Sequence, residues 1–320
     1  MAVYTQIDDE ALCTFLRDYD AGELTDYTGI QQGVENTNYR VETEADNFIL
    51  TLFEARVEPQ DIPFFFAFTD QLGKYGIDCP RAIADRQGVR IKQLAGKPAV
   101  LVTCLQGCDL APEEITPDHC RQLGQTLGVM HEAGQAFKRE RPNAMGLAKW
   151  KELAARCLAR GDDVEYDLPR FIAEEIDWIE SNWINGLPGG VVHTDLFPDN
   201  VFFDDTGRLS GIIDFYFACN DVLIYDLAMT CNAWCFDTDT RFVPERFDAL
   251  LEGYQQKRVL TDRERSAINL HLRASALRIL VTRLHDWLFH DDNNYVAPKD
   301  PRSFIERLRF HQQKDIANAG

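Results

Sequence analysis

The stretch VVHTDLFPDNVFF, residues 191–203, places four polar side chains in a short loop between two apolar runs. The apolar runs are rich in β-branched and aromatic residues, which is typical of strands. Loops held between strands commonly carry binding and catalytic groups. This loop is therefore the first candidate for a functional site, with the polar side chains His193, Asp195, Asp199 and Asn200.

A second apolar run, GIIDF at residues 211–215, ends in the carboxylate of Asp214. Between the two runs lies DDTGR, residues 204–208, which has the composition of a tight hairpin turn. A hairpin returns its second strand alongside the first, so Asp214 is expected beside Asn200. The sequence therefore predicts that Asp195, Asn200 and Asp214 converge on one place.

These three residues have the chemistry that phosphoryl transfer needs. The metal ions that bridge nucleotide phosphates prefer hard oxygen ligands, which the amide of Asn200 and the carboxylate of Asp214 supply. The acceptor hydroxyl needs a nearby carboxylate that orients it and accepts its proton. We interpret Asp195 as this base, and Asn200 and Asp214 as ligands of Mg²⁺.

The spacing H-x-D-x-x-x-x-N in HTDLFPDN resembles the catalytic loop of the protein-kinase-like superfamily, and IDF resembles the metal-binding segment that follows it. Pro198 and the later YDLA, residues 225–228, resemble the aminoglycoside-phosphotransferase-like branch, whose members phosphorylate small-molecule hydroxyls. Within that branch, segments along nearly the whole chain resemble bacterial type II homoserine kinases in the same order. These segments are FILTLFE, IPFFFAFTDQL, LGVMHEAG, YDLAMTCNAWCFD and ALRILVTRLHDW.

The resemblance implies an α+β, bilobal protein-kinase-like fold with ATP and Mg²⁺ as cofactors. It implies transfer of the γ-phosphoryl group to the hydroxyl of L-homoserine, giving O-phospho-L-homoserine on the route to threonine. Two alternatives remain open. The acceptor is another small hydroxyl compound, such as choline, a sugar or an aminoglycoside, or the chain is a pseudokinase that binds nucleotide without turnover.

The order of predicted elements agrees with two lobes. Strand-like runs fill residues 27–53, a helix follows that ends near Gly76, and further strands precede Gly107. Helical patterns then dominate, beginning with a helix that starts at Pro117 and is expected to end just before Gly134. We expect an antiparallel-sheet N-terminal lobe over 1–104 and a mainly helical C-terminal lobe over 105–320.

Composition narrows the class of protein. The 320 residues suit one large domain or two lobes. The net charge of -19, from 33 Lys+Arg against 52 Asp+Glu, argues against a nucleic-acid partner. No signal peptide and no membrane helix is expected from the sequence. The nine scattered cysteines are expected to be free thiols in a reducing cytoplasm, and the oligomeric state is left open.

Three further side chains, two histidines and one aspartate, are expected to have structural roles. In the superfamily that the chain resembles, the histidine at the place of His193 mainly holds the catalytic loop. Asp226, in the YDLA segment, is expected to brace that loop by hydrogen bonds. His131 lies on an apolar helical stripe, so we expect a buried histidine whose hydrogen bonds are satisfied.

The nucleotide is expected to contact the N-terminal lobe. QQGVENTNYRV, residues 31–41, would cover the β- and γ-phosphates with backbone amides, although an ordinary hairpin has the same pattern. VLVTCLQG would connect the lobes and pair with adenine, or simply form a buried strand. The candidate nucleotide-binding residues are Gly33, Asn36, Thr37, Asn38, Ile49, Arg56, Thr103, Cys104 and Leu105.

The third strand departs from the superfamily at one position. A Lys or Arg there usually pairs with the α- and β-phosphates, but FILTLFE has Thr51 instead. Arg56, just past the strand, is the first candidate for a replacement cation. Arg40 is the second, with a surface pair to Glu42 or Glu44 as its alternative role.

Recognition of a zwitterionic acceptor needs charges of both signs. Arg278 and Arg283 lie in the apolar helical run ALRILVTRLHDWLF, where an unpaired cation would be costly. They are candidates for the carboxylate of the acceptor. An ion pair between Arg283 and Asp286, three residues apart, is an equally good explanation for Arg283.

Overall fold

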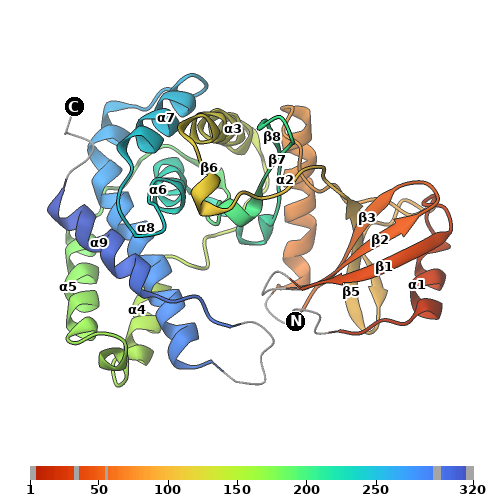
Figure 1. Cartoon of the computed structure of the whole chain (residues 1–320), viewed down its shortest axis with the longest axis horizontal. Coiled ribbons are helices and arrows are strands. Elements are labelled where there is room, and N and C mark those ends of the chain that lie inside the picture. The colour runs from red at the N-terminus through yellow and green to blue at the C-terminus, as the bar shows by residue number, and fades with distance from the viewer. Residues whose placement is uncertain (1–4, 32–35, 55–56, 291–296, 315–320) are drawn as a thin grey trace. The chain divides into compact units, whose positions relative to one another are not determined.

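The computed structural model describes residues 5–31, 36–54, 57–290 and 297–314. The chain divides into two compact units, one mainly within Met1–Lys74 and Asp78–Gln106, the other mainly within Gly107–Asp291 and Pro298–Gly320. The first unit contains an antiparallel sheet, and the second is mainly helical (Figure 1). The fold is therefore α+β.

The sheet of the first unit is antiparallel and has the strand order β1-β2-β3-β5-β4. One face packs on helix α1, Asp9–Leu16, through buried side chains that include Leu12, Val41, Leu50 and Leu101. Because side chains alternate along a strand, the neighbours of these residues lie on the opposite face. Helix α2, Ile62–Lys74, follows the third strand. The strands are β1 Leu24–Ile30, β2 Thr37–Thr43, β3 Asn47–Leu52, β4 Lys92–Leu94 and β5 Lys97–Thr103.

The second unit is built around one long helix, α8, Asp262–Leu288. Apolar side chains of α8 form a continuous buried core with those of α4, α5, α6 and α9, for example Ile176, Met229, Leu280 and Phe304. Helices α4, α5, α6 and α9 contact α8, whereas α3 packs against α7 (Figure 1). Their bounds are α3 Pro117–Ala136, α4 Leu147–Cys157, α5 Leu168–Ser181, α6 Leu223–Trp234, α7 Pro244–Gln255 and α9 Arg302–Gln313.

Two small antiparallel sheets carry the polar loop of the second unit. Strand β6, Gly189–Val192, pairs with β9, Cys219–Val222. Strand β7, Val201–Phe203, pairs with β8, Leu209–Ile212, and forms the hairpin that the DDTGR turn predicts. The loop between β6 and β7 therefore has both of its ends anchored in strands.

One helix end differs from the sequence-based prediction. The prediction placed Gly134 just past the end of its helix, but α3 continues to Ala136 and contains this glycine. A Cβ atom at position 134 would lie only 2.2 Å from the carbonyl oxygen of Val191. Gly134 is therefore a site of close approach between α3 and β6 and not a helix-ending residue.

In the described part of the chain, no helix is both long enough and apolar enough to cross a membrane.

Candidate active site

One buried carboxylate holds the loop after β6 by hydrogen bonds to its backbone. Asp226, on α6, is fully buried and accepts hydrogen bonds from the backbone N–H groups of His193, at 2.9 Å, and Thr194, at 2.7 Å. Thr194 has a φ of 63°, a backbone conformation that non-glycine residues seldom adopt. The prediction that Asp226 braces the loop by hydrogen bonds is confirmed.

His131 completes the support of Asp226. Its Nε2 lies 3.0 Å from Asp226 Oδ2, and its Nδ1 lies 2.7 Å from the hydroxyl of Tyr254. Burial alone would raise the pKa of Asp226, but the hydrogen bond with His131 and the neighbouring donors outweigh it and hold that pKa below its ordinary value. The prediction of a buried, hydrogen-bonded His131 is confirmed.

His193 uses both of its ring nitrogens inside the loop. Its Nε2 lies 3.0 Å from the carbonyl oxygen of Ile213, and its Nδ1 accepts the backbone N–H of Asp195 at 3.2 Å. This pattern requires a neutral ring that carries its proton on Nε2. Burial lowers the pKa of His193, which agrees with a neutral ring. His193 is therefore suited to hold the loop and not to carry the transferred proton.

The hairpin brings two of the candidate residues together. Val201 of β7 pairs with Ile212 of β8, and the N–H of Ile213 donates to the carbonyl oxygen of Asn200 at 3.0 Å. Asp214 follows directly, with a φ of 61° that turns the chain away from the strand. Asn200 and Asp214 are thus neighbours across the base of the hairpin.

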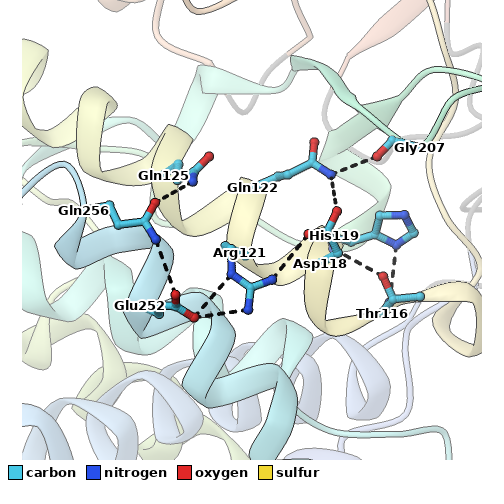
Figure 2. A network of polar contacts seen from close by, with 9 residues as sticks. All are labelled: Thr116, Asp118, His119, Arg121, Gln122, Gln125, Gly207, Glu252 and Gln256. Atoms are coloured by element: carbon cyan, nitrogen blue, oxygen red, sulfur yellow. Dashed lines mark hydrogen bonds and ion pairs between the residues drawn. The ribbon is translucent and has the colours of Figure 1, made fainter.

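Helix α3 holds this hairpin through Gln122. Its side-chain amide donates to the carbonyl oxygen of Gly207 at 2.9 Å and accepts the N–H of Leu209 at 2.9 Å. Figure 2 shows the first of these contacts beside the polar contacts that join α3 to α7. Those contacts join Arg121 to Glu252 at 3.1 Å and Gln125 to Gln256 at 2.7 Å. The hairpin is therefore fixed to the helical body of the unit.

Asp195 and Asn200 contact each other directly. The amide nitrogen of Asn200 donates to the backbone carbonyl of Asp195 at 2.8 Å and lies 3.4 Å from its Oδ2. Burial raises the pKa of Asp195, and the nearby Arg278, 4.0 Å from Oδ1, opposes that rise. The Asp195 side chain keeps 24% of its surface exposed, so a substrate can reach it.

The donor set at the hairpin fits Mg²⁺. Since the amide nitrogen of Asn200 is used in the bond to Asp195, its amide oxygen is the atom left to act as a ligand. The carboxylate of Asp214 is the second hard oxygen donor. Among the described residues, no group of three or more His, Cys, Asp and Glu side chains is placed to hold a metal ion. In kinases, Mg²⁺ usually has few protein ligands, and phosphates and water complete its coordination.

The candidate nucleotide residues of the first unit do not all lie together. Asn38, Ile49 and Thr51 share the sheet face opposite α1, where Thr51 donates to Asn38 Oδ1 at 2.7 Å. Thr37 lies on the face that packs on α1 and bonds to Glu54 at 2.7 Å. Gly33 and Arg56 lie outside the described residues.

The remaining candidates of the first unit have local contacts. Asn36 accepts the N–H of Glu54 at 3.2 Å. The N–H of Thr103 donates to the carbonyl oxygen of Arg81 at 3.0 Å, and the Cys104 thiol lies 3.7 Å from the carbonyl oxygen of Leu105. Arg40 forms the surface pair with Glu42, at 3.2 Å, that was its alternative role.

Similarity to known proteins shows the family of this chain. The model of the phosphotransferase enzyme family matches residues 26–260. The chain belongs to this family. A homoserine kinase of Rhizobium johnstonii is 46% identical over 313 residues, which cover 98% of this chain and 97% of that protein. A homoserine kinase of Gluconacetobacter diazotrophicus is 46% identical over 323 residues, with both chains fully covered.

Solved structures agree on the fold. A spectinomycin phosphotransferase in complex with ADP and spectinomycin superposes with a TM-score of 0.70 and 16% identity, covering 98% of this chain and 97% of the other. An amicoumacin kinase in complex with AMP-PNP and Ca²⁺ superposes with a TM-score of 0.72 and 15% identity, covering 96% and 94%. The predicted protein-kinase-like fold is confirmed, and this member of the phosphotransferase enzyme family is a small-molecule kinase.

The structure gives one arginine a role that the sequence does not reveal and adds a second arginine to the candidates. Arg278 of α8 donates to the carbonyl oxygen of Thr194 at 2.6 Å, so it holds the loop. Arg307 of α9 was absent from the sequence-based candidates. Its segment, RSFIERLRFHQQ, shows apolar residues at helical spacing with a cation beside them, but this pattern does not say which helix packs against it.

Proposed function

We propose that the chain is an ATP-dependent homoserine kinase that phosphorylates the side-chain hydroxyl of L-homoserine. The observation that carries this proposal is full-length identity near 46% to homoserine kinases, in a chain whose Asp195 and Asn200 meet beside Asp214. O-phospho-L-homoserine and ADP are then the products.

The residues of the second unit divide the chemistry between them. Asp195 orients the hydroxyl and accepts its proton as the oxygen forms its bond to the γ-phosphorus and the bond from that phosphorus to ADP breaks. Asn200 and Asp214 would hold Mg²⁺, which would supply positive charge opposite the nucleotide phosphates. Asp226, His193 and Arg278 keep the loop in place.

The first unit supplies the proposed nucleotide contacts. Backbone amides between Gly33 and Asn38 cover phosphate oxygens, Ile49 gives apolar contact, and the backbone of Thr103–Leu105 meets the adenine. Thr51 has no charge to offer a phosphate, and its hydroxyl is already bonded to Asn38. Arg56 remains the proposed cation of this unit.

An acceptor panel tests the proposal. ADP release is measured with Mg-ATP and, in turn, L-homoserine, choline, ethanolamine, a hexose and an aminoglycoside, with Asp195→Ala as the control. We expect homoserine to give the highest kcat/KM by at least tenfold and the control to give none. A higher kcat/KM for another acceptor would replace homoserine, and nucleotide binding without turnover on any acceptor would make the chain a pseudokinase.

A further inference from the structure

Two arginines of the second unit share one aromatic ring. The guanidinium carbon of Arg283, on α8, lies 4.6 Å from the ring centre of Phe304 on α9. The guanidinium carbon of Arg307, also on α9, lies 4.5 Å from the same ring centre. Two like charges therefore lie against one ring, and the charge of Arg283 lowers the pKa of Arg307, which is unfavourable unless an anion lies nearby.

Among the described residues, neither guanidinium has a carboxylate within ion-pair distance. The polar contact of Arg283 is to the hydroxyl of Ser303, at 3.4 Å, and Asp286, its predicted alternative partner, lies beside His285 instead. Arg307 donates to the carbonyl oxygen of Asn232 at 2.6 Å, but its buried Nε has no hydrogen-bond partner in the described structure.

Two other buried arginines of the same unit, Arg273 and Arg246, have several protein partners. Arg273 forms two parallel hydrogen bonds to Glu175, at 2.7 and 2.6 Å. Arg246 has no carboxylate either, but it donates to three backbone carbonyls, those of Pro112, Trp234 and Phe236. Arg278 also has a buried Nε without a partner, but it lies 4.0 Å from the Asp195 carboxylate, whereas Arg283 and Arg307 have no carboxylate at that distance among the described residues.

The pKa values of Arg283 and Arg307 agree with the lack of a direct carboxylate partner. Burial lowers the pKa of Arg283, and burial together with the charge of Arg283 lowers the pKa of Arg307 to about 10. Both groups still carry their charge at neutral pH. The charges of Asp195, Asp199 and Asp300 oppose the lowering of the Arg283 pKa, but among the described residues none of them pairs with it directly. A partly buried cation without a direct ion-pair partner gains from an incoming anion.

The pair lies beside the loop that carries the base. Phe197, two residues after Asp195, packs against Phe304 with ring centres 6.3 Å apart. The guanidinium carbon of Arg283 lies 5.8 Å from the ring centre of Phe197. An anion held by these arginines would therefore lie next to the residues that receive the acceptor hydroxyl.

We propose that Arg283 and Arg307 form an anion subsite that binds the carboxylate of the acceptor, with Ser303 as an additional donor. This inference rests on the proposed function and names the residues that select an amino acid over a simple amino alcohol. A guanidinium matches a carboxylate with two parallel hydrogen bonds, which a hydroxyl or an amine cannot replace. Arg278 is left out of the subsite because it donates to the catalytic loop.

The test compares two acceptors that differ only in the carboxylate. Values of kcat/KM are measured for L-homoserine and for 3-aminopropan-1-ol, which lacks the carboxylate, in the wild type, Arg283→Met, Arg307→Met and the double variant. Arg302→Met is the matched control, since it removes an exposed cation of α9 that pairs with Asp300. Arg283→Lys and Arg307→Lys keep the charge while removing the paired donors.

We expect each Met variant to raise the KM for homoserine by roughly 10- to 100-fold, as for one lost charge-assisted contact. The KM for ATP and the rate with 3-aminopropan-1-ol should stay unchanged, so the preference for homoserine falls by the same factor. The Lys variants should lie between wild type and Met, and Arg302→Met should match the wild type.

An unchanged preference ratio in the folded Met or Lys variants would overturn the subsite, and so would a rise confined to the KM for ATP. A wild type that does not phosphorylate homoserine would instead overturn the proposed function. The two failures are therefore distinguishable in the same set of assays.

Discussion

Two regions of the helical unit bury charge in opposite ways. Beneath the catalytic loop, the carboxylate of Asp226 is surrounded by His131 and by two backbone N–H groups. Between α8 and α9, Arg283 and Arg307 pack on Phe304 with no carboxylate in contact among the described residues. Both regions border the same loop, so the contrast does not follow from different parts of the fold.

The difference shows what each buried charge does. A buried charge with a full set of partners fixes the backbone around it, because any movement leaves a desolvated group unpaired. A buried charge that lacks a partner gains little from the folded chain alone, and its stabilisation depends on a ligand. The first region thus shapes the catalytic loop, and the second selects what is bound beside it.

The largest expected effect is a loss of kcat on replacing Asp195, in the loop that both regions border. Asp195→Ala should lower kcat by ~10²–10⁴-fold, because a positioned base typically contributes that much. Nucleotide affinity should change little, since the carboxylate meets the acceptor and not ATP. Steady-state kinetics and nucleotide binding by calorimetry check both parts.

A variant that keeps more than about a tenth of the wild-type kcat would contradict the role of Asp195. The structure adds a pH dependence. Since burial raises the pKa of Asp195, the acidic limb of the kcat profile should lie above the pH range of an ordinary aspartate, with activity lost as the pH falls.

Asp226→Ala tests the region where the charge is satisfied. Removing the carboxylate leaves His131 and two buried N–H groups without their partner, which should lower the free energy of unfolding by ~3–5 kcal/mol. Urea unfolding measures the change, and kcat should also fall because the loop loses its support. A variant with wild-type stability would show that the hydrogen bonds of Asp226 do not stabilise the fold.

The stabilising effect of Asp226 also has a pH dependence. The pKa of Asp226 lies below its ordinary value in the folded chain, so its contribution is complete above the unfolded pKa and is lost as the pH falls through the folded value. Unfolding measured between pH 7 and pH 3 should therefore show the difference between wild type and Asp226→Ala shrinking towards acid.

The two kinds of arginine give the sharpest contrast in stability. Arg273→Met leaves the buried carboxylate of Glu175 with the hydrogen bond from Gln312 but without its ion-pair partner, which should cost ~3–5 kcal/mol of unfolding free energy. Arg307→Met removes a cation that has no carboxylate, so the loss should be within ~1 kcal/mol or the variant should be more stable. Equal losses, measured by urea unfolding, would remove the distinction between the two kinds.

Asp214→Asn tests the metal ligands on the hairpin. Replacing the carboxylate with an amide removes an anionic ligand, so Mg²⁺-dependent ATP binding should weaken by roughly tenfold, the change that ~1.4 kcal/mol produces. The measurement is a Mg²⁺ titration of ATP binding, with Asp204→Asn in the hairpin turn as control. Unchanged Mg²⁺ dependence would place the metal elsewhere.

The smallest effect is expected at Thr51. Thr51→Ala removes the hydrogen bond to Asn38, worth ~0.5–1.5 kcal/mol of stability, and should leave the KM for ATP near that of the wild type. Arg56→Ala should raise the KM for ATP if Arg56 replaces the missing lysine. Equal, near-wild-type values in both variants would mean that neither residue serves the phosphates.

Local chemistry made part of the site predictable. The positions of Asn200 and Asp214 follow from a turn signal between two short strands, and the contact of Asn200 with Asp195 spans only five residues. The strands of the first unit were equally clear, because alternating apolar residues are bounded by turn residues.

Contacts between distant segments were not predictable in the same way. Arg307 and Arg283 meet through the packing of α9 on α8, and no periodicity specifies which faces of two helices touch. Gly134 was misread as a helix end because the approach of β6, which requires a glycine there, is not visible in the local sequence.

The central claim is that Asp195 directs the γ-phosphoryl group of ATP to the hydroxyl of homoserine. ³¹P NMR of the wild type with Mg-ATP and L-homoserine tests it most directly, because the product is identified and not inferred from ADP release. The account predicts one new phosphomonoester, O-phospho-L-homoserine, formed in step with ADP and absent with Asp195→Ala. Inorganic phosphate as the only product besides ADP, or the same phosphomonoester at a similar rate from Asp195→Ala, would contradict it.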